Sequence, residues 1–412
     1  FRASWICPVD SPPIPNAAVA VCDSKIISVG KFADVRANVP ADSLITDLGD
    51  GAIVPGLVNA HTHLEFSHLS HPLGQPGIEF TDWIRLIVNQ RSATLTKKSS
   101  DGKSHTIQQG IEESLASGVW TLGEIATAPI ELSDYRSNRK NLSTLIFMEQ
   151  LGRGRAVCET LKPALTSFLA SAQPLDSIAG VGASPHAPYS VGAELLPQMV
   201  SQATTADRPV AMHLAETLAE REFVEHQTGK FVELMKDFGI WDPSIFAIRH
   251  SILETLKILA SASSAIVVHG NYLNDQELDL IAEHTTNLAI AFCPRTHQFF
   301  GHSNYPLEKI LARKINLCVG TDSRASSPDL NLYSELQQIA GAFPALDAGL
   351  VLSMGTANGA HALGIENERG TLSTGKTAAL SLITPAGLSQ AHPHHWMFTA
   401  ASRCQPVLHA IT

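Results

Sequence analysis

Short apolar runs alternate with amphipathic segments through most of this 412-residue chain. The runs favour strands, whereas segments such as 220–238 and 275–284 carry apolar residues at helical spacing and charge on the other face. About eight such strand-then-helix units predict an α/β chain whose parallel sheet closes into a (β/α)8 TIM barrel. A doubly wound open sheet is the alternative, and the absence of G-x-G-x-x-G after the first strand disfavours it. The predicted strands are 118–122, 143–147, 178–183, 209–212, 265–268, 287–292 and 317–320.

Both ends of the chain show a different pattern, in which short β-rich runs are separated by turns. Residues 17–21, 25–29 and 43–48 favour strands, and residues 370–383 show a similar pattern. We therefore expect two domains. Residues 1–54 plus 366–412 would form a small β-sandwich from both termini, and residues 55–365 would form the barrel.

Several apolar runs end in residues that bind metals. The run before His61 and His63 places the two imidazoles two residues apart, so that they share one side of a strand. In a barrel, the C-terminal ends of the strands meet at the active-site face. Each strand-end residue could instead have a purely structural role, such as a helix N-cap for Asp322. Such a role would have to apply to every one of them at the same time, which is improbable. The further strand-end residues are His213, His269 and Asp322, and Glu216 follows His213 by three positions.

These motifs together resemble a known family. P-G-L-V-N-A-H-T-H-L, H-L-A-E-T, V-H-G-N and G-T-D-S are similar to the amidohydrolase superfamily. The nearest branch contains cytosine deaminase-like enzymes, S-adenosylhomocysteine/methylthioadenosine deaminases and triazine hydrolases. The resemblance covers essentially the whole chain, including G-T-L-x-x-G-K-x-A-x-L near the end.

The resemblance implies a role for each strand-end residue. His61, His63, His213 and Asp322 would bind the metal. His269 would hydrogen-bond the metal-bound water or the substrate, and Glu216 would be the proton shuttle. Chemistry agrees, because three neutral imidazoles and a carboxylate leave one position for water, whose pKa then falls to about 7. Glu216 is placed to pass a proton from that water to a ring nitrogen, and Asp322 to deliver one to the departing ammonia.

The number of metal ions follows from an absence. Binuclear relatives often use a carboxylated lysine on the fourth strand, and this chain has no lysine between Lys162 and Lys230. We therefore expect one divalent transition metal. Zinc and iron both suit three histidines and an aspartate, and the ligand types do not choose between them.

Substrate contacts are less well defined. His186 lies in S-P-H-A-P-Y, which resembles a run whose histidine contacts substrate in nucleoside-type deaminases, although a structural role fits equally well. Glu65 follows His63 closely and could line the pocket. Arg295 and His297 lie in C-P-R-T-H, where relatives usually show C-P-x-S-N. They could recognise an anionic or polyol group, and a salt-bridged arginine beside a solvated histidine is the alternative.

The expected function is that of an aminohydrolase, which deaminates a small nitrogen heterocycle such as an adenine-type nucleoside derivative. The alternative on the same scaffold is a hydrolase that opens a cyclic amide or imidazolone or displaces chloride, because this barrel hosts many chemistries. A non-catalytic scaffold is a third hypothesis. The retention of every candidate ligand disfavours it.

The expected partner is a small-molecule substrate, and composition gives no support for nucleic acid or a membrane. The formal net charge is −10 and no basic stripe is present, so nucleic-acid binding has no electrostatic support. No apolar segment approaches the roughly 20 residues that span a membrane. The six cysteines are scattered without a C-x-x-C pair, and residues 1–6 lack the pattern of a signal peptide. We expect a cytoplasmic protein, and a homo-oligomer is left open.

Overall fold

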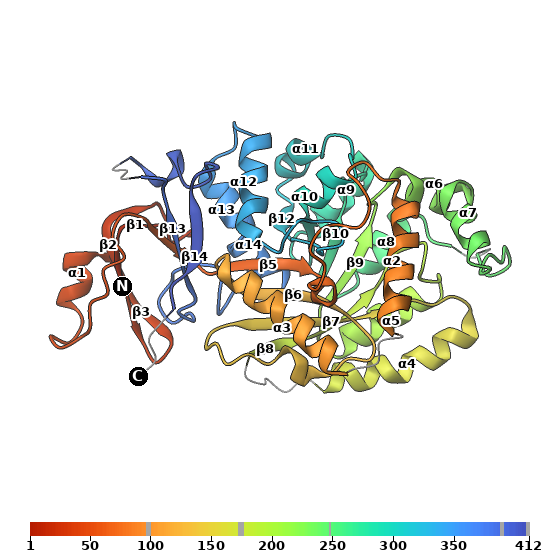
Figure 1. Cartoon of the computed structure of the whole chain (residues 1–412), viewed down its shortest axis with the longest axis horizontal. Helices are drawn as coiled ribbons and strands as arrows, with labels where there is room; N and C mark the ends of the chain where they lie inside the picture. The colour runs from red at the N-terminus through yellow and green to blue at the C-terminus, as the bar shows by residue number, and fades with distance from the viewer. Residues whose placement is uncertain (96–99, 172–176, 247–248, 388–390, 409–412) are drawn as a thin grey trace.

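The computed structural model describes residues 1–95, 100–171, 177–246, 249–387 and 391–408. Its strands form two sheets (Figure 1). One sheet combines segments from both ends of the chain, and the other is built from the middle of the chain and carries most of the helices. No helix in the described ranges is long and apolar enough to cross a membrane.

The larger sheet consists of eight strands in the described part of the chain, and every pairing between neighbouring strands is parallel. Its first and last strands approach each other through a parallel bridge between Thr62 and Asp322. The side-chain amide of Asn59 also donates to Thr321 Oγ1 at 2.8 Å across this seam. The α/β barrel prediction is confirmed. The strands are β5 (Leu57–Thr62), β6 (Val119–Thr127), β7 (Ser143–Gln150), β8 (Ile178–Pro185), β9 (Val210–Leu214), β10 (Ala265–His269), β11 (Leu288–Phe292) and β12 (Asn316–Val319).

The barrel interior is a packed apolar core, to which Val58, Ile125, Phe147 and Val268 contribute. Gly320 lies where β5 and the segment after β12 approach most closely. A Cβ atom there would lie 2.7 Å from the carbonyl oxygen of His61, which is too close for any side chain. Glycine at this position therefore allows the chain after β12 to bring Asp322 next to the histidines of β5.

Helices follow the barrel strands, as expected for strand-then-helix units. The segment 220–238, whose apolar residues recur at helical spacing, forms two helices. Gln227 (φ 56°) and Gly229 (φ 82°) adopt left-handed backbone conformations that end the first helix. The α-helices are α2 (Phe80–Leu95), α3 (Ser100–Ala116), α4 (Arg155–Ala170), α5 (Leu195–Thr205), α6 (Leu218–His226), α7 (Lys230–Asp237), α8 (Ile252–Leu259), α9 (Asp275–Glu283), α10 (Pro294–Phe299), α11 (Leu307–Ala312), α12 (Leu332–Ala342), α13 (Ala348–Met354) and α14 (Ala357–Ala362), and the 3-10 turns are η1 (Leu64–Phe66), η2 (Leu132–Tyr135) and η3 (Pro393–His395).

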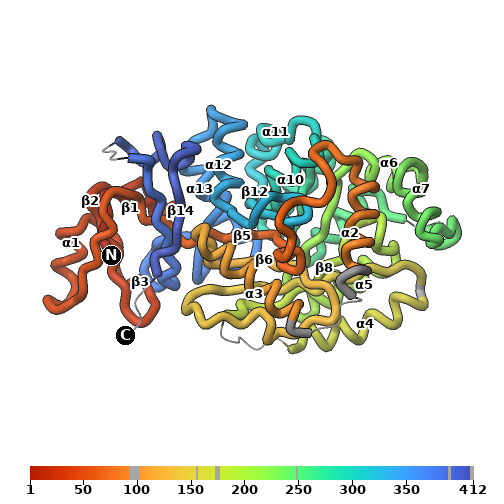
Figure 2. Tube along the Cα trace, in the orientation of Figure 1, coloured from red at the N-terminus to blue at the C-terminus, as the bar shows by residue number. Residues whose placement is uncertain are grey.

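The smaller sheet has six strands in the described residues, in the continuous order β14-β13-β4-β1-β2-β3. Figure 2 shows its red N-terminal and blue C-terminal traces side by side, because β4 pairs with both β1 and β13. The expected unit built from both termini is therefore confirmed. Its elements are β1 (Arg2–Ile6), β2 (Ile14–Cys22), β3 (Lys25–Lys31), α1 (Phe32–Ala37), β4 (Ala52–Pro55), β13 (Leu380–Thr384) and β14 (Arg403–Pro406).

One predicted strand of this unit, 43–48, is absent. The segment makes a single bridge between Asp47 and Arg2, and Leu44 is 88% exposed. The division into domains at 54/55 and 365/366 stays a prediction.

Candidate active site

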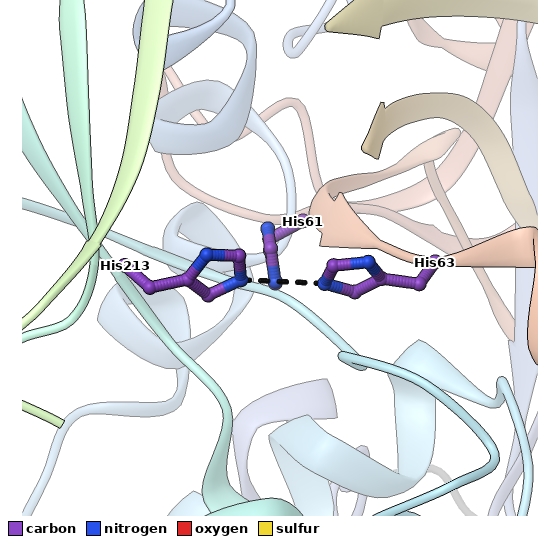
Figure 3. Close-up of side chains that lie close together, drawn as sticks. All are labelled: His61, His63 and His213. Atoms are coloured by element: carbon purple, nitrogen blue, oxygen red, sulfur yellow. Dashed lines mark hydrogen bonds between the residues drawn. The ribbon is translucent and has the colours of Figure 1, made fainter. Parts of the chain in front are cut away.

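Three histidines from two strands meet at the active-site face of the barrel. His61 lies on β5, His63 directly follows that strand, and His213 lies on β9. One ring nitrogen of each lies within 4.8 Å of the others, and Nε2 of His63 is 3.3 Å from Nε2 of His213. Figure 3 shows the three rings directed toward one another. This arrangement can hold one metal ion.

Asp322 completes the cluster from the other side of the barrel seam. Its Oδ1 lies 3.6 Å from Nε2 of His63 and 3.8 Å from Nε2 of His61. The hydroxyl of Ser326 donates to the other carboxylate oxygen at 2.9 Å and orients it. Asp322 has a left-handed backbone (φ 56°), a strained conformation for a non-glycine residue that is common at functional sites.

The histidine nitrogens have the hydrogen-bonding pattern of a metal site. Nδ1 of His213 lies 3.0 Å from the carbonyl oxygen of His186, so its Nε2 is left for the cluster. Both ring nitrogens of His61 and Nδ1 of His63 are buried, and none has a hydrogen-bond partner in the described part of the chain. Buried polar atoms without partners are costly. A transition metal at this point would satisfy the inward-facing nitrogens, so these residues fit the group.

Burial sets the ionisation of the cluster. It lowers the pKa of His61 and His63 well below 6.5 and that of His213 to about 4. The three imidazoles are therefore neutral at neutral pH, which is the form that binds metals. Burial raises the pKa of Asp322 to about 6. A cation among these groups would favour the ionised carboxylate and offset that shift.

Glu216 and His269 lie next to the cluster. Oε1 of Glu216 is 3.5 Å from Nε2 of His269, and both side chains are buried. Burial, reinforced by the charge of Asp322, raises the pKa of Glu216 well above its ordinary value. The loop that carries Glu216 is held by Glu220, whose carboxylate accepts the backbone N–H groups of Ala215 (2.9 Å) and Glu216 (2.7 Å).

A cavity of about 540 Å³ opens onto these groups. His63, His213, Glu216, His269 and Asp322 all line it, so the cluster and the acid/base candidate face the same space. The rest of its wall is mostly apolar and includes Phe80, Trp83, Ile87, Tyr189, Phe231 and Phe246. This volume lies within the range of about 300–1,000 Å³ that is typical of small-molecule sites.

The sequence profile described as Amidohydrolase family matches residues 52–404, which is most of the chain. The chain belongs to the amidohydrolase family. One curated relative, the 5-methylthioadenosine/S-adenosylhomocysteine deaminase of Moorella thermoacetica, is 28% identical over 92% of this chain and 83% of its own length.

Two solved structures show the same fold as this amidohydrolase. Helicobacter pylori aminofutalosine deaminase superposes with a TM-score of 0.80 at 21% identity and covers 99% of this chain and 97% of its own. A Xanthomonas campestris adenosine deaminase with bound zinc gives a TM-score of 0.75 at 22% identity, over 98% and 88% of the two chains. At these identities the likeness shows the fold alone.

The predicted substrate contacts of this amidohydrolase fall into two groups. His186 lines the cavity and its ring packs edge-on against His213, with centroids 5.2 Å apart. Glu65 is not among the cavity-lining residues. Its carboxylate accepts hydrogen bonds from Arg91 at 2.5 Å and from Thr127 Oγ1 at 2.6 Å. Glu65 therefore binds Arg91, which lines the cavity.

The structure does not bring Arg295 and His297 to this cavity. The guanidinium of Arg295 pairs with Glu335 (2.6 Å) and Asp329 (2.7 Å), as in the salt-bridged alternative. His297 lines a separate hollow with His302. Neither residue lines the cavity at the metal cluster, so this geometry does not support the predicted substrate role.

Sequence reasoning missed Glu149, a buried residue that lines the cavity near the end of β7. Its carboxylate and the rings of His186 and His213 each place one ligand atom within 4.8 Å of the others. The signal was present, because Glu149 is an acidic residue near the end of an apolar run, as Asp322 is. Arg91, on α2, also lines the cavity and was not selected.

Proposed function

We propose that this amidohydrolase is a metal-dependent aminohydrolase that removes an amino group from a small nitrogen heterocycle. The observation that carries the proposal is the convergence of three imidazoles and Asp322 on one point, beside the buried pair of Glu216 and His269, in one cavity. The named activity of the Moorella relative supports an adenine-type nucleoside derivative as substrate. The size of the cavity is compatible with such a molecule.

The proposed ligands are His61, His63, His213 and Asp322. When bound, a divalent transition metal supplies a Lewis acid and lowers the pKa of a coordinated water toward 7. Both zinc and iron suit this donor set. The zinc in the similar Xanthomonas structure makes zinc the first candidate to test.

Glu216 moves the proton in this proposal. Its place in the cavity lets the carboxylate accept a proton from the attacking water, and its raised pKa helps the carboxyl group to hold that proton until it passes to a ring nitrogen. His269 orients the attacking water or the substrate through Nε2. Asp322 would take the second proton of the attacking water and pass it to the departing ammonia. His186 contacts the substrate from the neighbouring wall of the cavity.

Two further features stay predictions. A cytoplasmic location agrees with six cysteines that form no disulfide among the described residues. A homo-oligomer is left open.

The proposal is tested by ammonia release. Purified zinc-loaded protein is incubated with adenosine, methylthioadenosine, adenosylhomocysteine, aminofutalosine, guanine and cytosine, and product masses are measured. Deamination replaces an amino group with a hydroxyl or oxo group, whereas ring opening adds a whole water. The proposal predicts ammonia from at least one compound, with the mass of the deaminated product. Metal-free protein is the control. A zinc-loaded protein that releases no ammonia from any of them, or one that opens a ring, contradicts the proposal.

A further inference from the structure

We propose that Glu149 and His186 accept hydrogen bonds from donors of the substrate, hydroxyl or amino groups other than the amine that leaves. This inference rests on the proposed function and specifies a chemical feature of the substrate. Glu149 lies near the end of β7 and His186 directly follows β8. Both line the cavity beside His213, so a substrate bound at the metal cluster lies against them.

The carboxylate of Glu149 has no donor of its own. Its side chain is only 2% exposed, and no described residue makes a hydrogen bond to it. Arg91 Nη2 lies 4.0 Å from Oε2, and His186 Nε2 lies 3.8 Å from Oε1. Both distances are too long for a hydrogen bond. A buried carboxylate in this state is costly, and a ligand that supplies a donor recovers that cost.

Neither neighbour makes a hydrogen bond to Glu149 in this arrangement. Nη2 of Arg91 donates instead to Glu65, whose other oxygen accepts from Thr127. The hydroxyl of Ser190 donates to the carbonyl of Ala187 at 3.1 Å, so it accepts from Nδ1 of His186 at 2.5 Å. In a neutral imidazole the other nitrogen, Nε2, then carries no proton. Two acceptors therefore lie 3.8 Å apart at the cavity wall, and each can accept a hydrogen bond from its own donor on the substrate.

A second metal ion is disfavoured at this point, although Glu149, His186 and His213 lie close enough to hold one. Nδ1 of His213 is occupied by the carbonyl of His186, and its Nε2 faces His63 at 3.3 Å. Only two ligands remain, which is too few for a stable site. The guanidinium of Arg91, 4.0 Å from Glu149, also repels a second cation. A neutral donor avoids both problems.

The chemistry of adenine then locates the donor on the substrate. In an adenine substituted at the position of a sugar, the ring nitrogens are acceptors and the only N–H donors belong to the leaving amine. The donors for Glu149 and His186 must therefore lie on the substituent, and in a nucleoside they are the neighbouring 2′- and 3′-hydroxyls of the sugar. Adenosine and 2′,3′-dideoxyadenosine are a matched pair of probes, because they differ only in two hydroxyl groups.

The test uses Glu149→Met, which keeps the volume and removes both acceptor oxygens. The matched control is Glu159→Met on the exposed face of α4, outside the cavity. We expect Glu149→Met to raise KM for adenosine by about 10- to 100-fold, the range for a hydrogen bond to a charged group. We expect kcat to stay nearly constant and KM for 2′,3′-dideoxyadenosine to be unchanged. Glu159→Met should match wild type with both probes.

Calorimetry on the metal-free protein gives a readout without turnover. Adenosine binding to metal-free Glu149→Met should be weaker than binding to metal-free wild type by the same factor as the rise in KM. In separate zinc-loaded samples, wild type and Glu149→Met should each contain one zinc ion per chain. Should Glu149→Met fail to fold, Glu149→Gln replaces it, with an expected loss of about 10-fold because one acceptor oxygen remains.

Three outcomes overturn the inference. If wild type deaminates adenosine and the Glu149 variants match it in KM and binding, the inference fails and the proposed function stands. If the variants lose zinc or lose kcat at constant KM, Glu149 acts on the metal or the chemistry instead. If wild type neither binds nor deaminates either nucleoside, the inference fails together with its adenine-nucleoside premise.

Discussion

Oε1 of Glu216 lies 3.5 Å from Nε2 of His269, and both side chains are more than nine-tenths buried. They come from the loop after β9 and from the end of β10, and they face the same cavity as the metal cluster. His269 has a left-handed backbone (φ 69°), which indicates that the surrounding structure holds its ring in place. A carboxyl group that can hold a proton is thus positioned next to an oriented imidazole.

Glu216→Gln tests the proton shuttle. The amide keeps the size of the side chain but cannot accept a proton, so we expect kcat to fall by about 10²- to 10⁴-fold. Zinc content, measured by elemental mass spectrometry, should stay at the wild-type level because Glu216 is not a proposed ligand. A variant with unchanged kcat would remove Glu216 from the mechanism.

Asp322→Asn should lose both turnover and metal. The carboxylate lies 3.6 Å from His63 Nε2 and is oriented by Ser326. Outer partners of metal ligands alone contribute about 10- to 100-fold in affinity, so loss of a ligand should exceed about 100-fold. Zinc affinity is measured by competition with a chromogenic chelator, and Ser326→Ala is the milder comparison. Full zinc affinity in Asp322→Asn would exclude Asp322 as a ligand.

The pH dependence of zinc binding follows from the pKa values of the empty site. The carboxyl of Asp322, with its pKa raised to about 6, takes up a proton below that pH and weakens binding. His213, with a pKa of about 4, stays neutral until the solution is much more acidic. Between pH 6 and pH 5 the zinc dissociation constant should therefore rise about 5-fold, because one proton competes and the carboxyl is already half protonated at pH 6. Asp322→Asn should show no such slope. A much steeper slope in wild type would mean that the histidines titrate in this range.

Arg295→Met tests the structural role of the arginine. The change leaves Glu335 buried without its partner, and breaking such a pair costs about 3–5 kcal/mol of unfolding free energy. The folded fraction should keep the wild-type KM, because Arg295 does not line the cavity. Urea unfolding and steady-state kinetics check the two halves of the prediction. A large rise in KM with unchanged stability would restore the predicted substrate role.

Much of the barrel was predictable because its information is local. The strand ends that carry His61, His213 and Asp322 were identified from apolar runs that stop at a polar residue, and the structure brings these residues together. A search for polar residues just after apolar runs, applied to the run 143–147, would also have found Glu149 two positions after its end. The exposed segment 43–48 shows the limit of the rule, because β-rich composition does not form a strand without a neighbour to pair with.

The sequence by itself determined the strand-then-helix order of the barrel, the strand-end residues of the metal cluster and the family. Only the tertiary structure decided which polar residues face the cavity. Arg295 and Glu65 found carboxylate or arginine partners elsewhere, whereas Glu149 was left without a donor. The physical reason is that a strand pattern depends on neighbours a few positions away, whereas the partner of a charged side chain is selected by packing between segments that are remote in the chain.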